Sequence, residues 1–153
     1  MKRTSPVFFY NSQGEILFQR RSANKRLLPN LWDTSASGHI DAGEEPIDTA
    51  VRETREEIGI DIRPEDLESL FRHRVYAELP EAGIINNEVI FAYCYKFSGS
   101  TDDLTLEPKE VADMRYFSRE EFVQGIKSPD EEPNFVVHGD LILKIFDHIS
   151  NVK

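Results

Sequence analysis

Residues 38–60 read GHIDAGEEPIDTAVRETREEIGI and contain the features of one short acidic helix. Pro46 suits the first turn of a helix, where its missing N–H costs nothing, and Gly59 suits the left-handed position just past a helix end. The spacing therefore predicts a helix over residues 46–58. One side of this helix is apolar and would fasten it to a core, through Ile47, Ala50, Val51 and Ile58.

Three glutamates share another face of the predicted helix. Glu56 and Glu57 follow Glu53 by three and four residues, so the three carboxylates can converge on one site. Oxygen ligands of this kind suit Mg²⁺ or Mn²⁺. Grouped carboxylates repel one another, and Arg52 partly offsets that repulsion. The alternative is a solvated acidic face, which is what most glutamate-rich helices have.

The glycines, acids and arginine of this segment resemble the Nudix box in type and spacing. The matching positions are Gly38, Glu44, Arg52, Glu53, Glu56, Glu57 and Gly59. Thr54 departs from the pattern, which usually has an aliphatic residue there, and this affects packing rather than ligation. The resemblance implies an α/β fold, specifically a Nudix-type α/β/α sandwich with a mixed β-sheet.

The resemblance also implies a reaction. A Nudix enzyme of this kind would hydrolyse a diphosphate linkage in a nucleoside diphosphate attached to another group, X, with Mg²⁺ or Mn²⁺ as cofactor. The implied metal ligands are Glu53, Glu56, Glu57 and the carbonyl oxygen of Gly38. Glu44 and Arg52 would orient those ligands. The general base varies in position within the superfamily, and Glu88 or Glu110 could serve here.

Composition limits the partners of the chain. With 153 residues, 39% of them apolar, it fits a single domain over residues 1–153. The net charge of −10 disfavours long nucleic acid but allows a small phosphorylated substrate, because a metal can supply positive charge locally. No segment approaches the roughly 18 apolar residues of a membrane span, so we expect a cytoplasmic protein with no membrane partner. A homodimer is a possible assembly. Cys94, the only cysteine, lies in an apolar run and is expected to be buried.

Periodicity and turn residues predict the remaining elements. Strands are expected at residues 7–10, 15–20, 32–35, 67–77, 88–97 and 111–117. Helices are expected over residues 119–126 and 134–149. The first of these helices follows a capping-box pattern of Ser118 and Glu121. Strands alternating with a few helices predict helices on either side of a mixed sheet.

A cationic segment precedes the acidic helix. Residues 19–26, QRRSANKR, resemble one branch of the superfamily, the isopentenyl-diphosphate isomerase-like proteins. In that branch an arginine and a lysine four residues later contact a diphosphate, and they match Arg21 and Lys25. Arginine also offers a fork suited to phosphate oxygens. The alternative is a solvated loop that balances local charge. Selectivity for the base and for X is expected to lie in loops 22–30 and 79–87.

Two further residues are candidates by position. Glu88 opens an apolar strand where the isomerases have an acidic catalytic residue, and a carboxylate there could bind a metal or act as a base. The alternative is an edge residue exposed to water. His39 matches one metal-binding histidine of the isomerases and could contact substrate or cap its loop. His73, His138 and His148 are isolated, and we expect them to be surface or core residues.

The resemblance to the isomerases fails where their chemistry lies. Their cysteine falls at Ser37 in this chain, whereas the glutamates of the acidic helix, several of which the isomerases lack, are complete. Hydrolysis is therefore the favoured function. An isopentenyl-diphosphate isomerase-like enzyme and a non-catalytic nucleotide-binding sensor are the alternatives.

Overall fold

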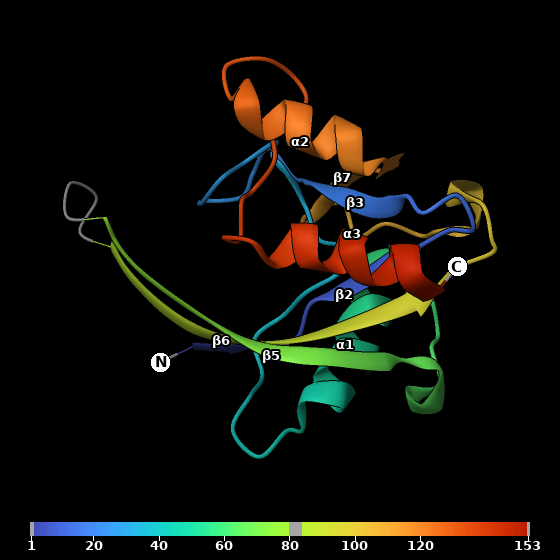
Figure 1. The fold of residues 1–153 in the computed structure, drawn as a ribbon. Helices are drawn as coiled ribbons and strands as arrows, with labels where there is room; N and C mark the ends of the chain where they lie inside the picture. The colour runs from blue at the N-terminus through green and yellow to red at the C-terminus, as the bar shows by residue number, and fades with distance from the viewer. Residues whose placement is uncertain (1, 80–83, 153) are drawn as a thin grey trace.

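The computed structural model describes residues 2–79 and 84–152, and within them a mixed sheet of seven strands runs through the molecule (Figure 1). The strands are β1 (Lys2–Thr4), β2 (Val7–Tyr10), β3 (Ile16–Arg21), β4 (Trp32–Asp33), β5 (Glu68–Leu79), β6 (Ile84–Lys96) and β7 (Val111–Phe117). The helices are α1 (Pro46–Ile58), α2 (Arg119–Lys127) and α3 (Leu141–Val152), with 3₁₀ turns η1 (Pro64–Asp66) and η3 (Thr101–Asp103).

Strand β6 organises the sheet. Its first half pairs in parallel with β1 and its second half in parallel with β2, while β5 runs antiparallel along its other edge. Strand β3 extends the sheet beyond β2 and pairs antiparallel with β2, β4 and β7. Both kinds of pairing occur, which confirms the predicted mixed sheet.

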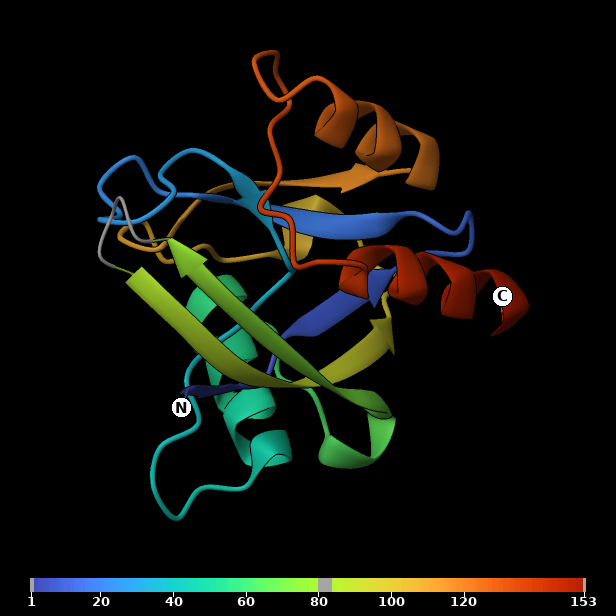
Figure 2. The ribbon, with the colours of Figure 1, turned by 60° about the vertical axis from the view of Figure 1, so that its left-hand side comes forward.

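Helices cover both faces of this sheet (Figure 2). Successive side chains of a strand point to opposite faces, and β2 shows this clearly. Phe8 and Tyr10 enter a core cluster with residues of α2 and α3. Val7 and Phe9 enter a second cluster with residues of α1. The two clusters confirm the predicted α/β/α sandwich.

Helix α1 has the bounds that its sequence predicts. Pro46 occupies the first turn, and Gly59 follows the helix with a left-handed φ of 74°. The Gly59 N–H donates to the carbonyl of Arg55 at 3.0 Å, which closes the last turn. Thr54 is fully buried where the family pattern has an aliphatic residue. Its hydroxyl donates to the Ala50 carbonyl at 2.7 Å, so the polar group is satisfied inside the core.

The capping box before α2 and the burial of Cys94 are also confirmed. Both hydrogen bonds of the Ser118–Glu121 capping box form at the start of α2. Cys94 is buried, with a free thiol. In the described part of the chain, no helix has the length and apolar content needed to cross a membrane.

The prediction for the last helix was wrong at its start. Helix α3 begins at Leu141 rather than at residue 134. The preceding residues pair with β4 instead: the Trp32 N–H donates to the Asn134 carbonyl at 2.8 Å, and the Val136 N–H donates to the Trp32 carbonyl at 2.8 Å. Gly139 then takes a φ of 57°, which turns the chain before α3. Tertiary pairing overrides the helical periodicity here.

Two further differences from the predicted secondary structure occur. Strand β1 was not predicted, because its three polar residues carry little strand signal. The predicted loop 79–87 is largely a continuation of the β5–β6 hairpin, in which Tyr76 pairs with Asn87 and Ala77 with Asn86. Residues 80–83 of that predicted loop lie outside the described residues. The hairpin projects well beyond the body of the protein (Figure 1).

Gly59 and Gly43 provide a matched test of the contact between the end of α1 and Thr105. Both have positive φ, so an alanine at either position is strained by about 1–2 kcal/mol. A Cβ at Gly59 would also meet the Thr105 Cβ at 2.8 Å, whereas a Cβ at Gly43 has no neighbour within 4 Å. We expect Gly59→Ala to lower the free energy of unfolding in urea by about 1–3 kcal/mol more than Gly43→Ala does. Equal losses would show that the contact with Thr105 is unimportant.

Candidate active site

A cleft of about 1130 Å³ gathers most of the residues that the sequence singles out. Its walls come from β1, β3, α1, β6, the loops around residues 22–41 and the segments 107–110 and 136–138. The predicted site residues that line it are Arg21, Lys25, Gly38, His39, Arg52, Glu53, Glu56, Glu57, Glu88 and Glu110. Glu44 lies behind this lining and contacts Arg52. The fold therefore brings together residues that are up to 89 positions apart in the sequence.

Glu57 is the most enclosed carboxylate of α1, with 8% of its surface exposed. Its Oε1 accepts hydrogen bonds from Gln19 Nε2 at 3.1 Å and from the Ser37 N–H at 3.0 Å. Burial raises the pKa of Glu57 to about 7, although these two hydrogen bonds act in the opposite direction. A buried carboxylate held in this way favours a positively charged partner, because such a partner stabilises its ionised form.

Arg52 connects the other acids of the helix. Its Nε and Nη2 each donate to Glu44 at 3.1 Å, and its Nη1 lies 2.9 Å from Glu53 Oε1 and 3.3 Å from Glu56 Oε2. The hydrogen bonds from Arg52 and Thr49 lower the pKa of Glu44 to about 2. The hydrogen bonds that Arg52 donates to Glu44 also raise the pKa of Arg52 itself. One guanidinium therefore keeps Glu44 ionised and holds two neighbouring carboxylates in place.

Gly38 allows the closest approach of the loop to α1. A Cβ at this position would lie 2.2 Å from the Glu53 carboxyl carbon, so only glycine fits while Glu53 keeps this position. The Gly38 carbonyl accepts a hydrogen bond from the Ser5 N–H at 3.2 Å, which leaves a second lone pair. Burial raises the pKa of Glu53, as it does for Glu57. Loop and helix thus present oxygen atoms to the same space.

The charge of the cleft favours a bound cation. Among the described residues, eight carboxylates and four Lys or Arg side chains line it. This excess of negative charge would repel a phosphate. Burial raises the pKa values of Glu53 and Glu57, the two carboxylates at its centre, so a nearby cation would stabilise their ionised forms. Oxygen donors in this arrangement fit a hard divalent cation such as Mg²⁺ or Mn²⁺.

The two predicted diphosphate contacts already have protein partners. Arg21 donates from Nη2 and Nε to the Leu27 carbonyl, at 2.9 and 3.3 Å, and from Nε to the Leu28 carbonyl at 3.1 Å. It thereby supports a loop in which Leu28 has a positive φ of 49°. Lys25 forms an ion pair with Glu110 at 2.5 Å. Both cations line the cleft, but they also shape the loop and balance its charge.

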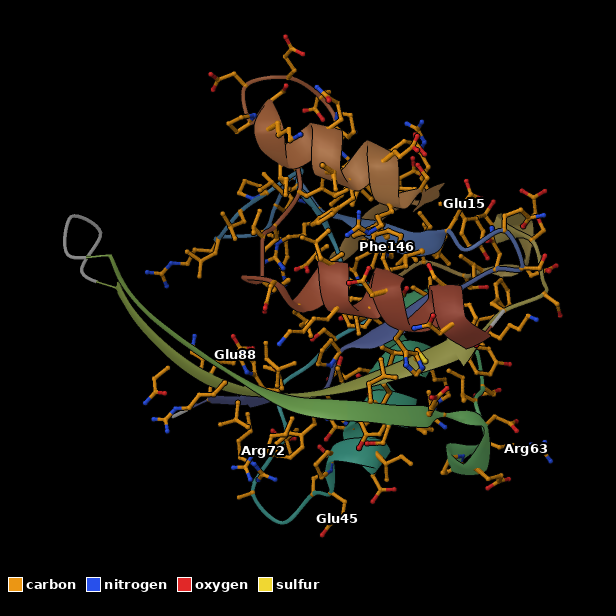
Figure 3. All side chains as sticks on the ribbon, viewed as in Figure 1. Glu15, Glu45, Arg63, Arg72, Glu88 and Phe146 are labelled. Atoms are coloured by element: carbon orange, nitrogen blue, oxygen red, sulfur yellow. The ribbon has the colours of Figure 1, made fainter. Side chains whose placement is uncertain are left out.

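Glu88 and His39 lie on the wall next to β1. Glu88 is partly buried rather than fully exposed, and its Oε1 accepts a hydrogen bond from the Thr4 hydroxyl at 2.6 Å. Figure 3 shows Glu88 on β6, at the end of the molecule from which the β5–β6 hairpin projects. His39 forms an isolated bridge with Thr4, so backbone pairing fixes its place beside Gly38.

The expectation that His138 is merely an isolated residue was wrong. Its Nε2 lies 2.7 Å from Asp33 Oδ1, and both side chains line the cleft. Burial alone would lower the pKa of His138, but the charge of Asp33 and their hydrogen bond raise it. Burial alone would raise the pKa of Asp33, and His138 and Arg21 lower it. Both shifts favour the charged forms of the pair, and the partly buried His138 side chain lines the cleft.

Sequence reasoning missed this pair because its members are 105 residues apart. Only the pairing of residues 134–136 with β4 brings them together. Leu27, Leu28 and Val137, each about half exposed, form an aliphatic rim on the same cleft. Nothing in the local sequence of these residues indicates that they share one surface.

The fold, the carboxylate helix and the metal-compatible cleft together define a Nudix domain. Residues 2–136 match the NUDIX domain family, and the chain belongs to it. Enzymes of this family are, in general, pyrophosphohydrolases that act on small phosphorylated compounds and use divalent metal ions.

Individual relatives agree with this assignment. An uncharacterized Nudix hydrolase of Listeria innocua is 31% identical over 82% of this chain and 68% of its own length. An isopentenyl-diphosphate Δ-isomerase of Salmonella arizonae is 30% identical over 79% of this chain. This chain spans 64% of that isomerase's length.

Solved structures show the same fold. The MutT protein of Methanosarcina mazei has a TM-score of 0.64 at 22% identity and covers 99% of this chain and 94% of its own. The Nudix domain of Shewanella oneidensis NrtR, solved with ADP ribose, has a TM-score of 0.68 at 15% identity. That comparison covers 99% of this chain and 88% of the NrtR domain.

Glu57 should make the free energy of unfolding of the metal-free protein depend on pH. Its pKa is about 7 in the folded protein and 4.5 as an ordinary glutamate, so the folded state holds the proton more tightly. Its contribution to stability is therefore complete below about pH 4.5 and lost as the pH rises to about 7. Over this range the free energy of unfolding of the wild type should fall by roughly 3 kcal/mol relative to Glu57→Gln. Urea unfolding in EDTA at several pH values measures this difference, and a constant difference would contradict the effect of burial.

Proposed function

We propose that this protein is a Mg²⁺- or Mn²⁺-dependent hydrolase that cleaves the diphosphate linkage of a nucleoside diphosphate attached to a group X. The observation that carries the proposal is the convergence of Glu53, Glu56 and Glu57 in one cleft with the arginine network that holds them. Family membership supports the reaction class. The particular substrate, the metal and the roles of individual residues belong to the proposal.

In this proposal the metal ligands are Glu53, Glu56, Glu57 and the carbonyl oxygen of Gly38. A bound cation would neutralise phosphate charge and lower the pKa of a bound water. Arg52 would orient two of the carboxylates directly, and Glu44 would orient Arg52 through its two-pronged hydrogen bond. Gln19, which the sequence did not single out, would hold the buried carboxylate of Glu57.

Glu88 is the better of the two candidate bases. Glu110 is tied to Lys25 by an ion pair, which makes its carboxylate less available for proton transfer. Glu88 accepts a hydrogen bond from the neutral hydroxyl of Thr4, which orients one oxygen without a positive charge. We therefore assign Glu88 the role of accepting a proton from the attacking water.

The substrate would lie between the acidic helix and the opposite wall. Its phosphate oxygens would contact Lys25, Arg21, His39 and His138, and would replace protein carboxylates as partners of these side chains. The aliphatic rim of Leu27, Leu28 and Val137 would cover an apolar part of the base or of X. ADP ribose, which the NrtR domain holds, is a nucleoside diphosphate joined to a sugar and belongs in any first substrate panel.

One alternative enzyme has specific support. The Salmonella relative is named an isopentenyl-diphosphate isomerase, and its diphosphate substrate would also suit this cleft. Ser37 lines the cleft where the isomerases have cysteine. A non-catalytic sensor would not need three metal carboxylates, so we disfavour it. A cytoplasmic location, a single domain over residues 1–153 and a homodimer stay predictions.

Glu57→Gln tests the metal assignment. The change keeps the shape of the side chain and removes its charge, so the fold should remain while hydrolysis falls about 10²-fold or more. The measurement uses the best substrate from a panel of nucleotide sugars, nucleoside di- and triphosphates, dinucleotides and prenyl diphosphates with Mg²⁺ or Mn²⁺. Glu45→Gln is the control, because Glu45 is exposed at the start of α1 and does not line the cleft (Figure 3). Near wild-type turnover in Glu57→Gln would refute the assignment.

Proton exchange separates hydrolase from isomerase. A serine hydroxyl is far less acidic than a thiol, whose pKa is about 8.5, so Ser37 cannot replace the isomerase cysteine in proton transfer to carbon. We expect no enzyme-dependent deuterium incorporation when isopentenyl diphosphate is incubated in D₂O with Mg²⁺ or Mn²⁺ and followed by NMR. Incorporation above the enzyme-free rate would favour the isomerase.

A further inference from the structure

Three side chains of types that can bind metals lie together far from the cleft, at the other end of β6. Glu68 and Cys94 are cross-strand partners on β5 and β6, and His148 on α3 packs against them. Glu68 Oε2 lies 3.7 Å from Cys94 Sγ, and Glu68 Oε1 lies 2.8 Å from His148 Nε2. One ligand atom from each residue fits within 4.8 Å of the other two. Three elements therefore aim a sulfur, a nitrogen and an oxygen at one point.

We propose that Glu68, Cys94 and His148 form a Zn²⁺ site that is separate from the catalytic cleft. Zn²⁺ binds thiolate, imidazole and carboxylate at about 2.0–2.3 Å, which places its ligands roughly 3–4 Å from one another. Glu68 lies 3.7 Å from Cys94 and 2.8 Å from His148, and a ligand atom of Cys94 lies within 4.8 Å of one of His148, so small shifts would bring the three into that range. This mixed donor set disfavours Mg²⁺, which takes oxygen ligands, so the two sites select different metals.

His148 provides an independent sign that a partner belongs here. Its Nε2 is buried and forms no hydrogen bond with the described residues, although Glu68 Oε1 is only 2.8 Å away. The ring nitrogen is thus close to the carboxylate but does not meet it in hydrogen-bond geometry. A buried ring nitrogen without a hydrogen bond is unfavourable. A cation between the two groups would satisfy both of them.

Binding requires one proton to leave. Burial and the neighbouring Glu68 raise the pKa of the Cys94 thiol to about 12, so the metal-free thiol keeps its proton. Zn²⁺ would form a bond to sulfur as the S–H bond breaks, and the proton would pass to solvent. Three side chains leave a fourth position, which water would fill.

The site would tie the last helix to the sheet. Helix α3 would be linked through His148 to both strands of the β5–β6 pair, so bound Zn²⁺ should stabilise the folded protein. None of the three residues lines the cleft, and Cys94 lies roughly 20 Å along β6 from Glu88. The proposal therefore stands independently of the reaction assigned to the cleft.

Cobalt is a direct probe, because a cysteine thiolate bound to Co²⁺ absorbs in the near ultraviolet by charge transfer. Cys94 is the only cysteine of the chain, so such a band reports this site alone. With excess Mg²⁺ present, we expect Co²⁺ to produce the band with saturation at one equivalent, and Zn²⁺ to abolish it. Glu57→Gln should keep the band. Absence of the band in the folded wild type with Co²⁺ in large excess would overturn the proposal.

Variants distinguish a site formed by all three residues from metal binding by the Cys94 thiol alone. His148→Ala and Glu68→Gln should each weaken Co²⁺ binding by about tenfold or more, while Glu65→Gln, on an exposed carboxylate of η1, should not. Zn²⁺ should raise the midpoint of thermal unfolding of the wild type but not of His148→Ala. Circular dichroism checks that each variant is folded. Unchanged Co²⁺ affinity in both His148→Ala and Glu68→Gln would refute the three-residue site.

Discussion

The candidate site depends on the hydrogen bonds and ion pairs between the Arg52 guanidinium and the carboxylates around it. A helix that carries several glutamates on one face is destabilised by their mutual repulsion. Arg52 contacts Glu53 and Glu56 on its own helix and binds Glu44 in the preceding loop. Glu57 lies beyond its reach and is held by neutral donors instead. The helix therefore presents carboxylates held by the charge of Arg52 and one carboxylate held by neutral hydrogen-bond donors.

The sheet determines where that helix can act. Because β2 alternates between two cores, α1 packs on one face while α2 and α3 cover the other. The cleft opens where α1, the end of β3 and the start of β6 come together. Its acidic side and its cationic and aliphatic wall come from distant parts of the chain. The composition of the opposite wall thus depends on tertiary structure even though the metal-compatible carboxylates lie within one short segment.

This division explains what could be predicted from the sequence. Helix α1 and its cap at Gly59 follow from local rules of periodicity and backbone conformation, and the structure agrees with them residue by residue. The Asp33–His138 pair and the cluster around Cys94 could not be found in this way, because neither follows from local spacing. The start of α3 was wrong for the same reason: the helical pattern of residues 134–140 gave way to pairing with a strand about a hundred residues earlier.

The pairing of residues 134–136 with β4 has a consequence for the order in which the site is built during synthesis. A chain that emerges from the ribosome presents β2, β3 and α1 long before the segment that carries His138. All carboxylates that line the cleft therefore precede this segment in the order of synthesis. The opposite wall closes only when the last fifth of the chain returns to Trp32. Synthesis of the acidic side and completion of the cleft are therefore separate in time.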